Sequence, residues 1–318
     1  MDTLPPEVEE ILEEGTFCYA GTSTAHGPHV TPMVFVVSGG RVWLTTSRGS
    51  VKGHVWRSDA RIGGLVRAQD VSVSFTGRVR TYDLLETNTW GRDVLEAPAL
   101  TLAATRFTRK NAHFFAGYAV DARHVPLSWT PPGRVFVSAE LDRAAIVGGG
   151  RVAESFGAWP DELVSFERFR AARAGEGPLS GLPYDVRDAL GDRGLGALAI
   201  QGADGVVVLP VSWVVDGASL YAALPESELA LAGCAEPVVP AALAVDRPSS
   251  WRAKHMAGAM LRGRAELFAT DRLTSGGRSA DRIVAAAGVD PEGSALVRVR
   301  PTRLVWWQGW SSGTVIVE

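Results

Sequence analysis

Short apolar runs, separated by turns that contain glycine or proline, occupy most of this chain. In its first eighty or so residues such runs lie at 16–22, 30–37, 41–46, 62–66 and 71–81. Runs of this length predict β-strands, and the turns at 25–28 and 38–40 are short enough to join antiparallel neighbours. Residues 5–14, with apolar positions three and four apart, and residues 50–58 predict short helices instead. The pattern therefore predicts a mainly β domain with few helices.

The same order of residues returns in the second half of the chain. Residues 4–8 (LPPEV) come back as residues 182–186 (LPYDV), an offset of 182 − 4 = 178. At this offset Gly27 falls on Gly205 and Pro32 on Pro210. A period of this length is too long for a solenoid repeat and indicates a duplicated domain.

The repeat divides the chain into two copies and a connection. We expect a first domain at 1–146 with a helical insertion at 83–132, a linker at 147–181 and a second domain at 182–318. Because duplication can replace an intermolecular two-fold axis by an intramolecular one, we expect the copies to pack as a pseudo-dimer. The protein would then be a monomer or a weak homodimer.

Composition narrows the classes of partner. A formal net charge of −3 gives no general attraction to nucleic acid, and we expect no apolar segment that spans a membrane. The two cysteines, Cys18 and Cys234, lie in different copies, so we expect no disulfide and a cytoplasmic protein. The six histidines show no metal-ligand spacing, so we expect no metal site.

One loop of the first copy carries the clearest candidate chemistry. Residues 45–52 run from the end of a strand into a helix and include Ser47, Arg48, Ser50 and Lys52. Hydroxyl groups and cations at a helix start suit a phosphate monoester, although an ordinary helix cap with two solvated cations is an equal alternative. In the second copy this loop is lost, because carboxylates replace the arginine and the serine at residues 226 and 228.

The order of several segments resembles a known family. Residues 27–32, 43–46, 50–52 and 76–79, together with the closing strand at 299–307, resemble the flavin-binding split-barrel proteins related to pyridoxamine 5′-phosphate oxidase. The resemblance covers residues 4–145 and, more weakly, 182–310. It implies two tandem six-stranded antiparallel split β-barrels with short helices, packed as a pseudo-dimer. In that family FMN lies in the groove between two barrels.

The resemblance also implies roles for individual residues. Ser50 and Lys52 match the family's phosphate-binding residues, and Thr31 stands where the oxidase has an arginine, which argues against vitamin B6 as the substrate. The full set of implied cofactor-binding residues is Val30, Thr31 and Pro32 along the ring, Thr45 and Thr46 beside it, and Ser47, Arg48, Ser50 and Lys52 at the phosphate. No catalytic residue is identified.

Three functions remain open at this point. The first is an FMN- or deazaflavin-dependent oxidoreductase that transfers hydride to or from a small organic substrate, since a flavin supplies the difficult chemistry itself. The second is a non-enzymatic carrier, sensor or store of flavin or heme. The third is a cofactor-free duplicated barrel. The sequence favours the first, and it does not separate FMN from the deazaflavin coenzyme.

Overall fold

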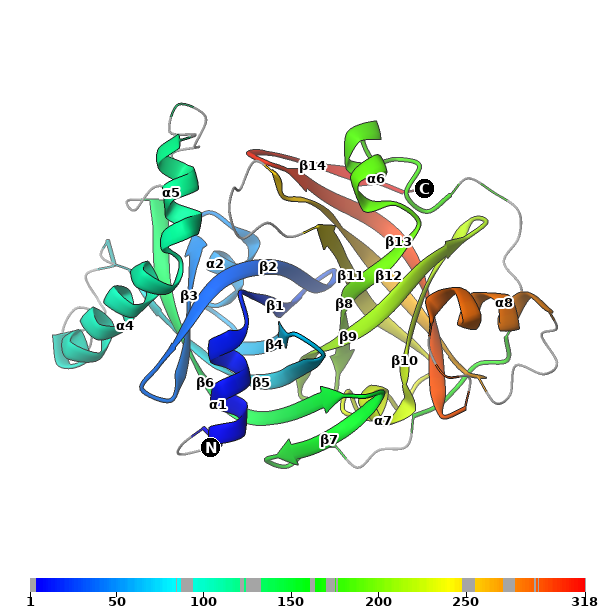
Figure 1. Cartoon of the computed structure of the whole chain (residues 1–318), viewed down its shortest axis with the longest axis horizontal. Coiled ribbons are helices and arrows are strands. Elements are labelled where there is room, and N and C mark those ends of the chain that lie inside the picture. The colour runs from blue at the N-terminus through cyan, green and yellow to red at the C-terminus, as the bar shows by residue number, and fades with distance from the viewer. Residues whose placement is uncertain are drawn as a thin grey trace.

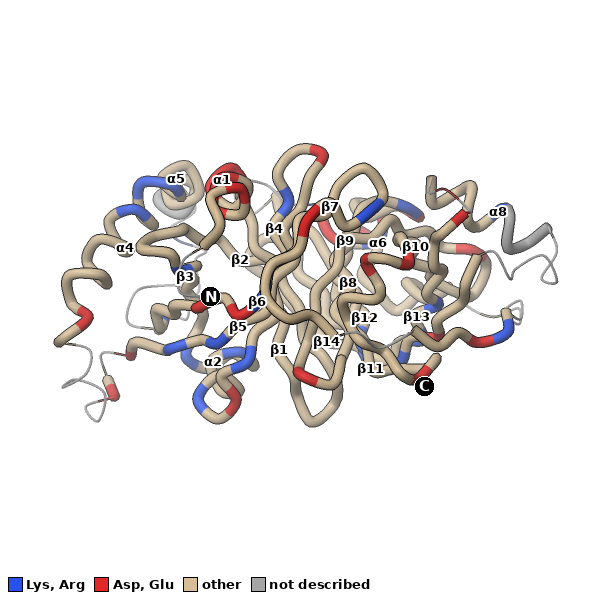
Figure 2. Tube along the Cα trace, turned by 90° about the horizontal axis from the view of Figure 1, so that it is seen from below, with Lys and Arg blue, Asp and Glu red and all other residues tan. Residues whose placement is uncertain are grey.

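The computed structural model describes residues 4–83, 85–86, 94–120, 123, 133–160, 164–169, 175, 177–247, 255–270, 278–288, 290 and 292–317. Parts of the expected insertion at 83–132 therefore lie outside the described residues. The described chain forms two antiparallel sheets of seven strands each, one from each half of the sequence. Figures 1 and 2 show them side by side, with α4 and α5 at one end of the molecule and α8 at the other.

The first sheet closes into a barrel of six strands, because β3 pairs with β6. Its strands run in the order β3-β2-β1-β4-β5-β6, with β7 added outside the closure. The elements are α1 (Pro6–Glu14), β1 (Phe17–Thr24), β2 (Gly27–Ser38), β3 (Arg41–Ser47), α2 (Val51–Val55), β4 (Arg61–Ala68), β5 (Val71–Tyr82), α4 (Ala97–Lys110), α5 (Ala112–Val120), β6 (Arg134–Gly148) and β7 (Arg151–Phe156).

The second sheet repeats this topology and is closed by the pairing of β10 with β13. Its elements are α6 (Tyr184–Leu190), β8 (Arg193–Gly202), β9 (Gly205–Asp216), β10 (Ser219–Pro225), α7 (Glu226–Ala230), β11 (Val238–Arg247), β12 (Ala257–Ala269), α8 (Arg278–Ala287), β13 (Ser294–Gln308) and β14 (Ser311–Ile316). The prediction of two tandem six-stranded antiparallel barrels with short helices is confirmed.

Corresponding irregularities mark the two barrels as copies. Each has a register shift before a glycine, at Gly77 in β5 and at Gly263 in β12. A Cβ atom at either glycine would lie 2.1 Å from the carbonyl oxygen of Glu140 or 2.0 Å from that of Arg300, so the bulge admits only glycine. Strands β5 and β12 correspond at an offset of 263 − 77 = 186.

The barrels pack against each other as the duplication predicts. Strand β2 contacts β11 and β12, and β9 contacts β4 and β5 in the same way. Ser23 Oγ donates to Gln201 Oε1 at 2.7 Å, and 201 − 23 = 178, so two equivalent positions meet across the interface. A residue contacts its own equivalent only near a two-fold axis, which makes this arrangement a pseudo-dimer.

A buried apolar cluster fills the interface between the barrels. Its buried members are Tyr19, Val30, Leu65, Ala197, Ala199, Val206, Val208, Ala242, Ala244 and Met260. Two polar contacts related by the pseudo-two-fold axis cross it: Ser74 Oγ donates to the carbonyl oxygen of Val208 at 2.7 Å, and the amide of Val30 donates to Met260 Sδ at 3.3 Å. The second barrel therefore forms one wall of the region next to β2.

The first sheet continues past residue 146. Strand β6 ends at Gly148, and β7 pairs back onto it through a turn in which Gly149 and Gly150 have φ of 58° and 75°. A two-residue turn of this type needs positive φ at both central residues, which glycine adopts easily. The stretch that we expected to be a linker therefore begins with a hairpin. Cys18 and Cys234 are both buried, and neither forms a disulfide. Among the described helices, none has the length and apolar character to cross a membrane.

Candidate cofactor-binding site

The candidate loop joins the end of β3 to the start of α2. Ser50 caps the helix, because its Oγ accepts from the amide of Gly53 at 3.0 Å, and the same Oγ lies 2.8 Å from Thr46 Oγ1. At Gly53 a Cβ atom would lie 2.6 Å from the carbonyl oxygen of Ser47, so the helix sits directly against the strand end. Because α2 spans only five residues, its dipole is small and side chains must carry any attraction for an anion.

Lys52 is the unusual residue of this loop. Its side chain is buried, with a relative exposure of 3%, and its ammonium group donates to Thr31 Oγ1. Burial lowers the pKa of Lys52 from 10.5 to about 7, offset in part by the thiol of Cys18. Within the described part of the chain no carboxylate pairs with it. Burying an ammonium group without a partner is costly, so this lysine favours the binding of an anion.

Two further basic residues belong to this region. Burial, together with the charges of Lys52 and Arg262, lowers the pKa of His29 to about 2. Arg262 comes from β12 of the second barrel, is buried, and has its pKa lowered by burial and by Arg303. The region next to β2 is therefore positive and draws its cations from both barrels.

The remaining cations of the loop already have partners. Arg48 pairs with the buried Asp83, with Nη2 2.6 Å from Oδ1, and Arg57 contacts the other oxygen of that carboxylate at 3.2 Å. The Nε atom of Arg48 is buried and has no hydrogen-bond partner among the described residues. Thr45 accepts from Arg134 through its Oγ1 and its carbonyl oxygen, both at 2.7 Å from Nη2. The structure thus brings Thr31 to Lys52 and Thr46 to Ser50, whereas Arg48 and Thr45 face other residues.

The other three predicted residues flank this cluster. Val30 is fully buried against the second barrel, and the carbonyl of Ser47 accepts from the amide of Ser50 at 3.0 Å. Pro32 is paired with Tyr19 of β1, and the pairing of β2 with β3 begins only at Phe35. Among the described strands Pro32 therefore lies at an edge of the sheet, where its missing donor costs no ladder bond.

The equivalent loop of the second barrel has different chemistry. Glu228 falls on Ser50 in the sequence (228 − 50 = 178), but it lies within α7, whose N-cap is Pro225. It is 3% exposed and has a buried Oε2 without a hydrogen-bond partner among the described residues. Burial raises the pKa of Glu228 to about 8, so its carboxyl group is largely protonated at pH 7. Repulsion between Glu228 and a phosphate is therefore weak near neutral pH. The lack of a cation matters more, since Ala230 replaces Lys52.

Sequence reasoning missed the contribution of the second barrel. Arg262 precedes the bulge glycine Gly263, which the sequence does match to Gly77 of the first copy. Nothing in the sequence brings residue 262 near β2, because that proximity arises only when the barrels pack. His29, on which the charges of both Lys52 and Arg262 act, also belongs to this region.

Comparison with known proteins agrees with this geometry. Residues 4–103 match the sequence model of the family described as pyridoxamine 5′-phosphate oxidase. Over these residues the first barrel is similar to that family. The predicted resemblance is thus confirmed, and the matched region contains all nine candidate residues. No curated protein matches the chain in sequence.

Several solved structures match a part of this chain that is about as long as one barrel. A heme-binding protein from Mycobacterium smegmatis is 23% identical, with 41% of this chain and 54% of that chain covered and a TM-score of 0.32. A protein described as an F420 reductase is 17% identical, with coverages of 45% and 98% and a TM-score of 0.30. A FAD-binding protein from Mesorhizobium loti is 17% identical, with coverages of 45% and 94% and a TM-score of 0.29.

Proposed function

We propose that this protein binds FMN through a phosphate contact at Lys52 and acts as an oxidoreductase that transfers hydride to or from a small organic substrate. The deazaflavin coenzyme, which also carries a phosphate and a planar ring, is the alternative cofactor for the same contact. The observation that carries the proposal is a buried lysine without an acidic partner among the described residues, in the barrel that matches the family.

The charges around Lys52 support an anionic ligand. The positive charges of Lys52 and Arg262 both lower the pKa of His29, and this repulsion is relieved when a phosphate dianion neutralises them. Hydrogen bonds between charged groups are among the stronger ones in proteins. Binding of a phosphate ester would therefore offset the free-energy cost of burying the Lys52 ammonium group.

Each residue of the cluster has a distinct task in this proposal. Thr31 accepts a hydrogen bond from Lys52 and so fixes the direction of the ammonium group. Thr46 and Ser50, bonded to each other, hold the end of β3 against the start of α2. Arg262 adds a second positive charge from the other barrel. When bound, the flavin itself supplies the hydride chemistry, and the protein contributes binding, orientation and exclusion of water.

The test compares FMN with riboflavin, which lacks the phosphate. We expect the parent protein to bind FMN more tightly by about 1.5–3 kcal/mol, or about ten- to a hundredfold. Lys52→Met should remove most of that preference and leave riboflavin binding nearly unchanged. Lys110→Met is the matched control, because Lys110 also has a pKa lowered by burial, to about 8, but donates to the carbonyl oxygen of Leu12. An undiminished preference for FMN in Lys52→Met would place the phosphate elsewhere.

A second experiment separates an enzyme from a carrier. The flavin-loaded protein should be reduced by a nicotinamide or by reduced deazaflavin and then reoxidised by an added electron acceptor over many turnovers. Binding of FMN without such turnover would favour the non-enzymatic alternative. The binding result and the turnover result are independent, so either part of the proposal can fail alone.

A further inference from the structure

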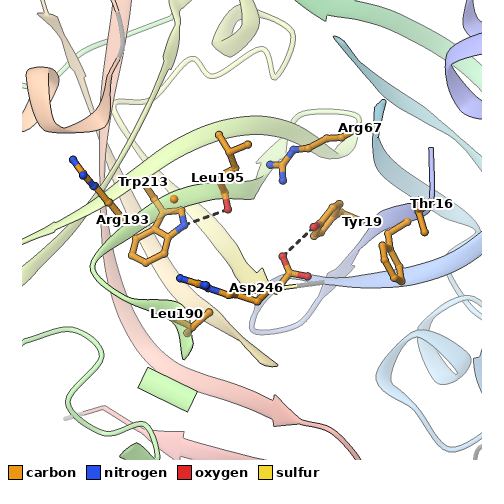
Figure 3. A pocket seen from close by; sticks show the side chains of 11 residues that line it. Thr16, Tyr19, Arg67, Leu190, Arg193, Leu195, Trp213 and Asp246 are labelled. Carbon is orange, nitrogen blue, oxygen red and sulfur yellow. Dashed lines mark hydrogen bonds between the residues drawn. The ribbon is translucent and has the colours of Figure 1, made fainter. Parts of the chain in front are cut away.

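A second cavity of about 600 Å³ lies between the barrels, apart from the Lys52 cluster (Figure 3). Its lining includes Tyr19 from β1, Arg67 from β4, Trp213 from β9 and Asp246 from β11. Both barrels therefore contribute walls. Cavities of this size hold small organic molecules, whose binding sites commonly measure about 300–1,000 Å³.

One polar atom in this wall has no partner within the described structure. The hydroxyl of Tyr19 donates to Asp246 Oδ1 at 2.9 Å, whereas Oδ2 of the same carboxylate is buried and accepts no hydrogen bond from any described residue. Burial raises the pKa of Asp246 to about 6, so the carboxylate is mostly ionised at pH 7 and above. A buried carboxylate oxygen is strongly stabilised when a ligand supplies an N–H donor.

The three arginines that line the cavity have little effect on a ligand at Asp246. Arg67 is engaged twice, since it donates to the carbonyl oxygen of Gly196 and lies over the Tyr19 ring with its Cζ 5.1 Å from the centroid. Arg193 and Arg247 are exposed, so water and salt screen their charges. The buried Asp246 oxygen is therefore the group that gains most from a ligand.

Aromatic side chains supply the rest of the recognition surface. Phe17, Tyr19 and Trp213 all line the cavity and are otherwise buried. The indole Nε1 of Trp213 donates to the carbonyl oxygen of Leu195 at 3.2 Å, which fixes the ring in place. Figure 3 shows Asp246 between the Tyr19 side and the Trp213 side of the cavity. Aromatic walls around one acceptor suit a planar ligand.

The cavity lies across the pseudo-two-fold axis. Phe17 and Leu195 are equivalent positions (195 − 17 = 178), and both line the cavity. Arg67 and Asp246 are equivalent as well, because Leu65 pairs with Tyr19 as Ala244 pairs with Ala197 (244 − 65 = 246 − 67 = 179). The two halves nevertheless differ in chemistry, since a cation stands opposite a carboxylate and Ala197 stands where the first copy has Tyr19.

We propose that this cavity is a second ligand site, for a small planar aromatic molecule that presents N–H donors, such as an amidine or an amino-substituted heterocycle, to Asp246. The site is independent of the proposed flavin site and needs no cofactor. Its ligand is held by N–H donation to Oδ2 and by contact with the aromatic side chains of Phe17 and Trp213, since Arg67 already covers one face of Tyr19.

Benzamidine is the probe and benzoate its matched counterpart, because the two differ in presenting donors or acceptors from the same ring. We expect calorimetry or ligand-observed NMR to show that benzamidine binds more tightly than benzoate. Asp246→Asn, which keeps an acceptor for Tyr19 but removes the charge, should weaken benzamidine binding about tenfold or more. Tighter binding of benzoate, no binding of benzamidine, or an unchanged affinity in folded Asp246→Asn protein would overturn the proposal.

A second variant tests the location without touching the carboxylate. Leu195 lines the cavity and is 64% exposed, so Leu195→Trp can extend a large ring over it with little disturbance of the core. We expect this variant to lose benzamidine binding while it binds FMN as the parent does. Unchanged benzamidine binding would show that the ligand lies elsewhere, and a parallel loss of FMN binding would show that the cavity is not a separate site.

Discussion

Replacing Lys52 by methionine should change how the stability of the protein depends on pH. The pKa of Lys52 is about 7 in the folded protein and 10.5 in the unfolded chain. Below pH 7 both states carry the charge, and the folded state bears the full cost of burying it. Between pH 7 and 10.5 the unfolded chain binds more protons, so the free energy of unfolding rises with pH, by at most about 1.4 kcal/mol per pH unit.

The methionine variant lacks this dependence and keeps nearly the same side-chain volume. The difference in unfolding free energy between variant and parent should therefore shift in favour of the parent by about 3 kcal/mol between pH 7 and pH 10. Urea unfolding followed by tryptophan fluorescence at several pH values measures it. Other groups that titrate in this range, including Lys110, are common to both proteins and cancel in the difference.

A difference that stays constant from pH 7 to pH 10 would refute the reasoning, because it would mean that Lys52 keeps an ordinary pKa. The lysine would then be solvated or paired, and the main support for an anion site would be lost. Saturating FMN should itself flatten the parent's profile, since a bound phosphate restores the charged form of Lys52.

Three further predictions concern the second barrel and the interface. Arg262→Met should weaken FMN binding about tenfold in a fluorescence titration, because it removes a buried positive charge that, like Lys52, acts on His29; unchanged affinity would exclude the second barrel from the site. In urea unfolding, the free energy of unfolding of Glu228→Gln should rise relative to that of the parent as pH increases from 5 to 9. The reason is that the parent's carboxyl group, with its pKa raised to about 8, loses its stabilising contribution as it ionises. Parallel pH profiles of the two proteins would contradict this. Gly63→Ala should cost about 1–3 kcal/mol of stability, since its Cβ would lie 2.1 Å from the carbonyl oxygen of Val206 across the interface, whereas Gly49→Ala, which has open space, should be nearly neutral.

Most of the fold was predictable because it depends on local signals. Alternating apolar runs and glycine-containing turns gave the strands, and the constant offset gave the duplication and the packing of the copies. The hairpin at Gly149 and Gly150 was missed although its signal is local, because the apolar pattern of β7 is weak: four of its six residues are exposed.

The candidate site was harder to predict because its decisive properties are not local. The pairing of Arg48 with Asp83 joins residues 83 − 48 = 35 positions apart, and the sequence gives no sign that this cation is already neutralised. The burial of Lys52 and the presence of Arg262 near His29 depend on how the barrels pack. Likewise, the protonation of Glu228 follows from burial, which residue type alone does not reveal.

Titration of the purified protein with FMN tests the central claim most directly. Isothermal calorimetry, supported by quenching of flavin fluorescence, should give saturable binding with a stoichiometry near one per chain, because only the first barrel keeps a lysine at the phosphate position. A stoichiometry of two would mean that the Glu228 loop also binds the cofactor. No binding of either FMN or the deazaflavin coenzyme would contradict the proposed function at its first step.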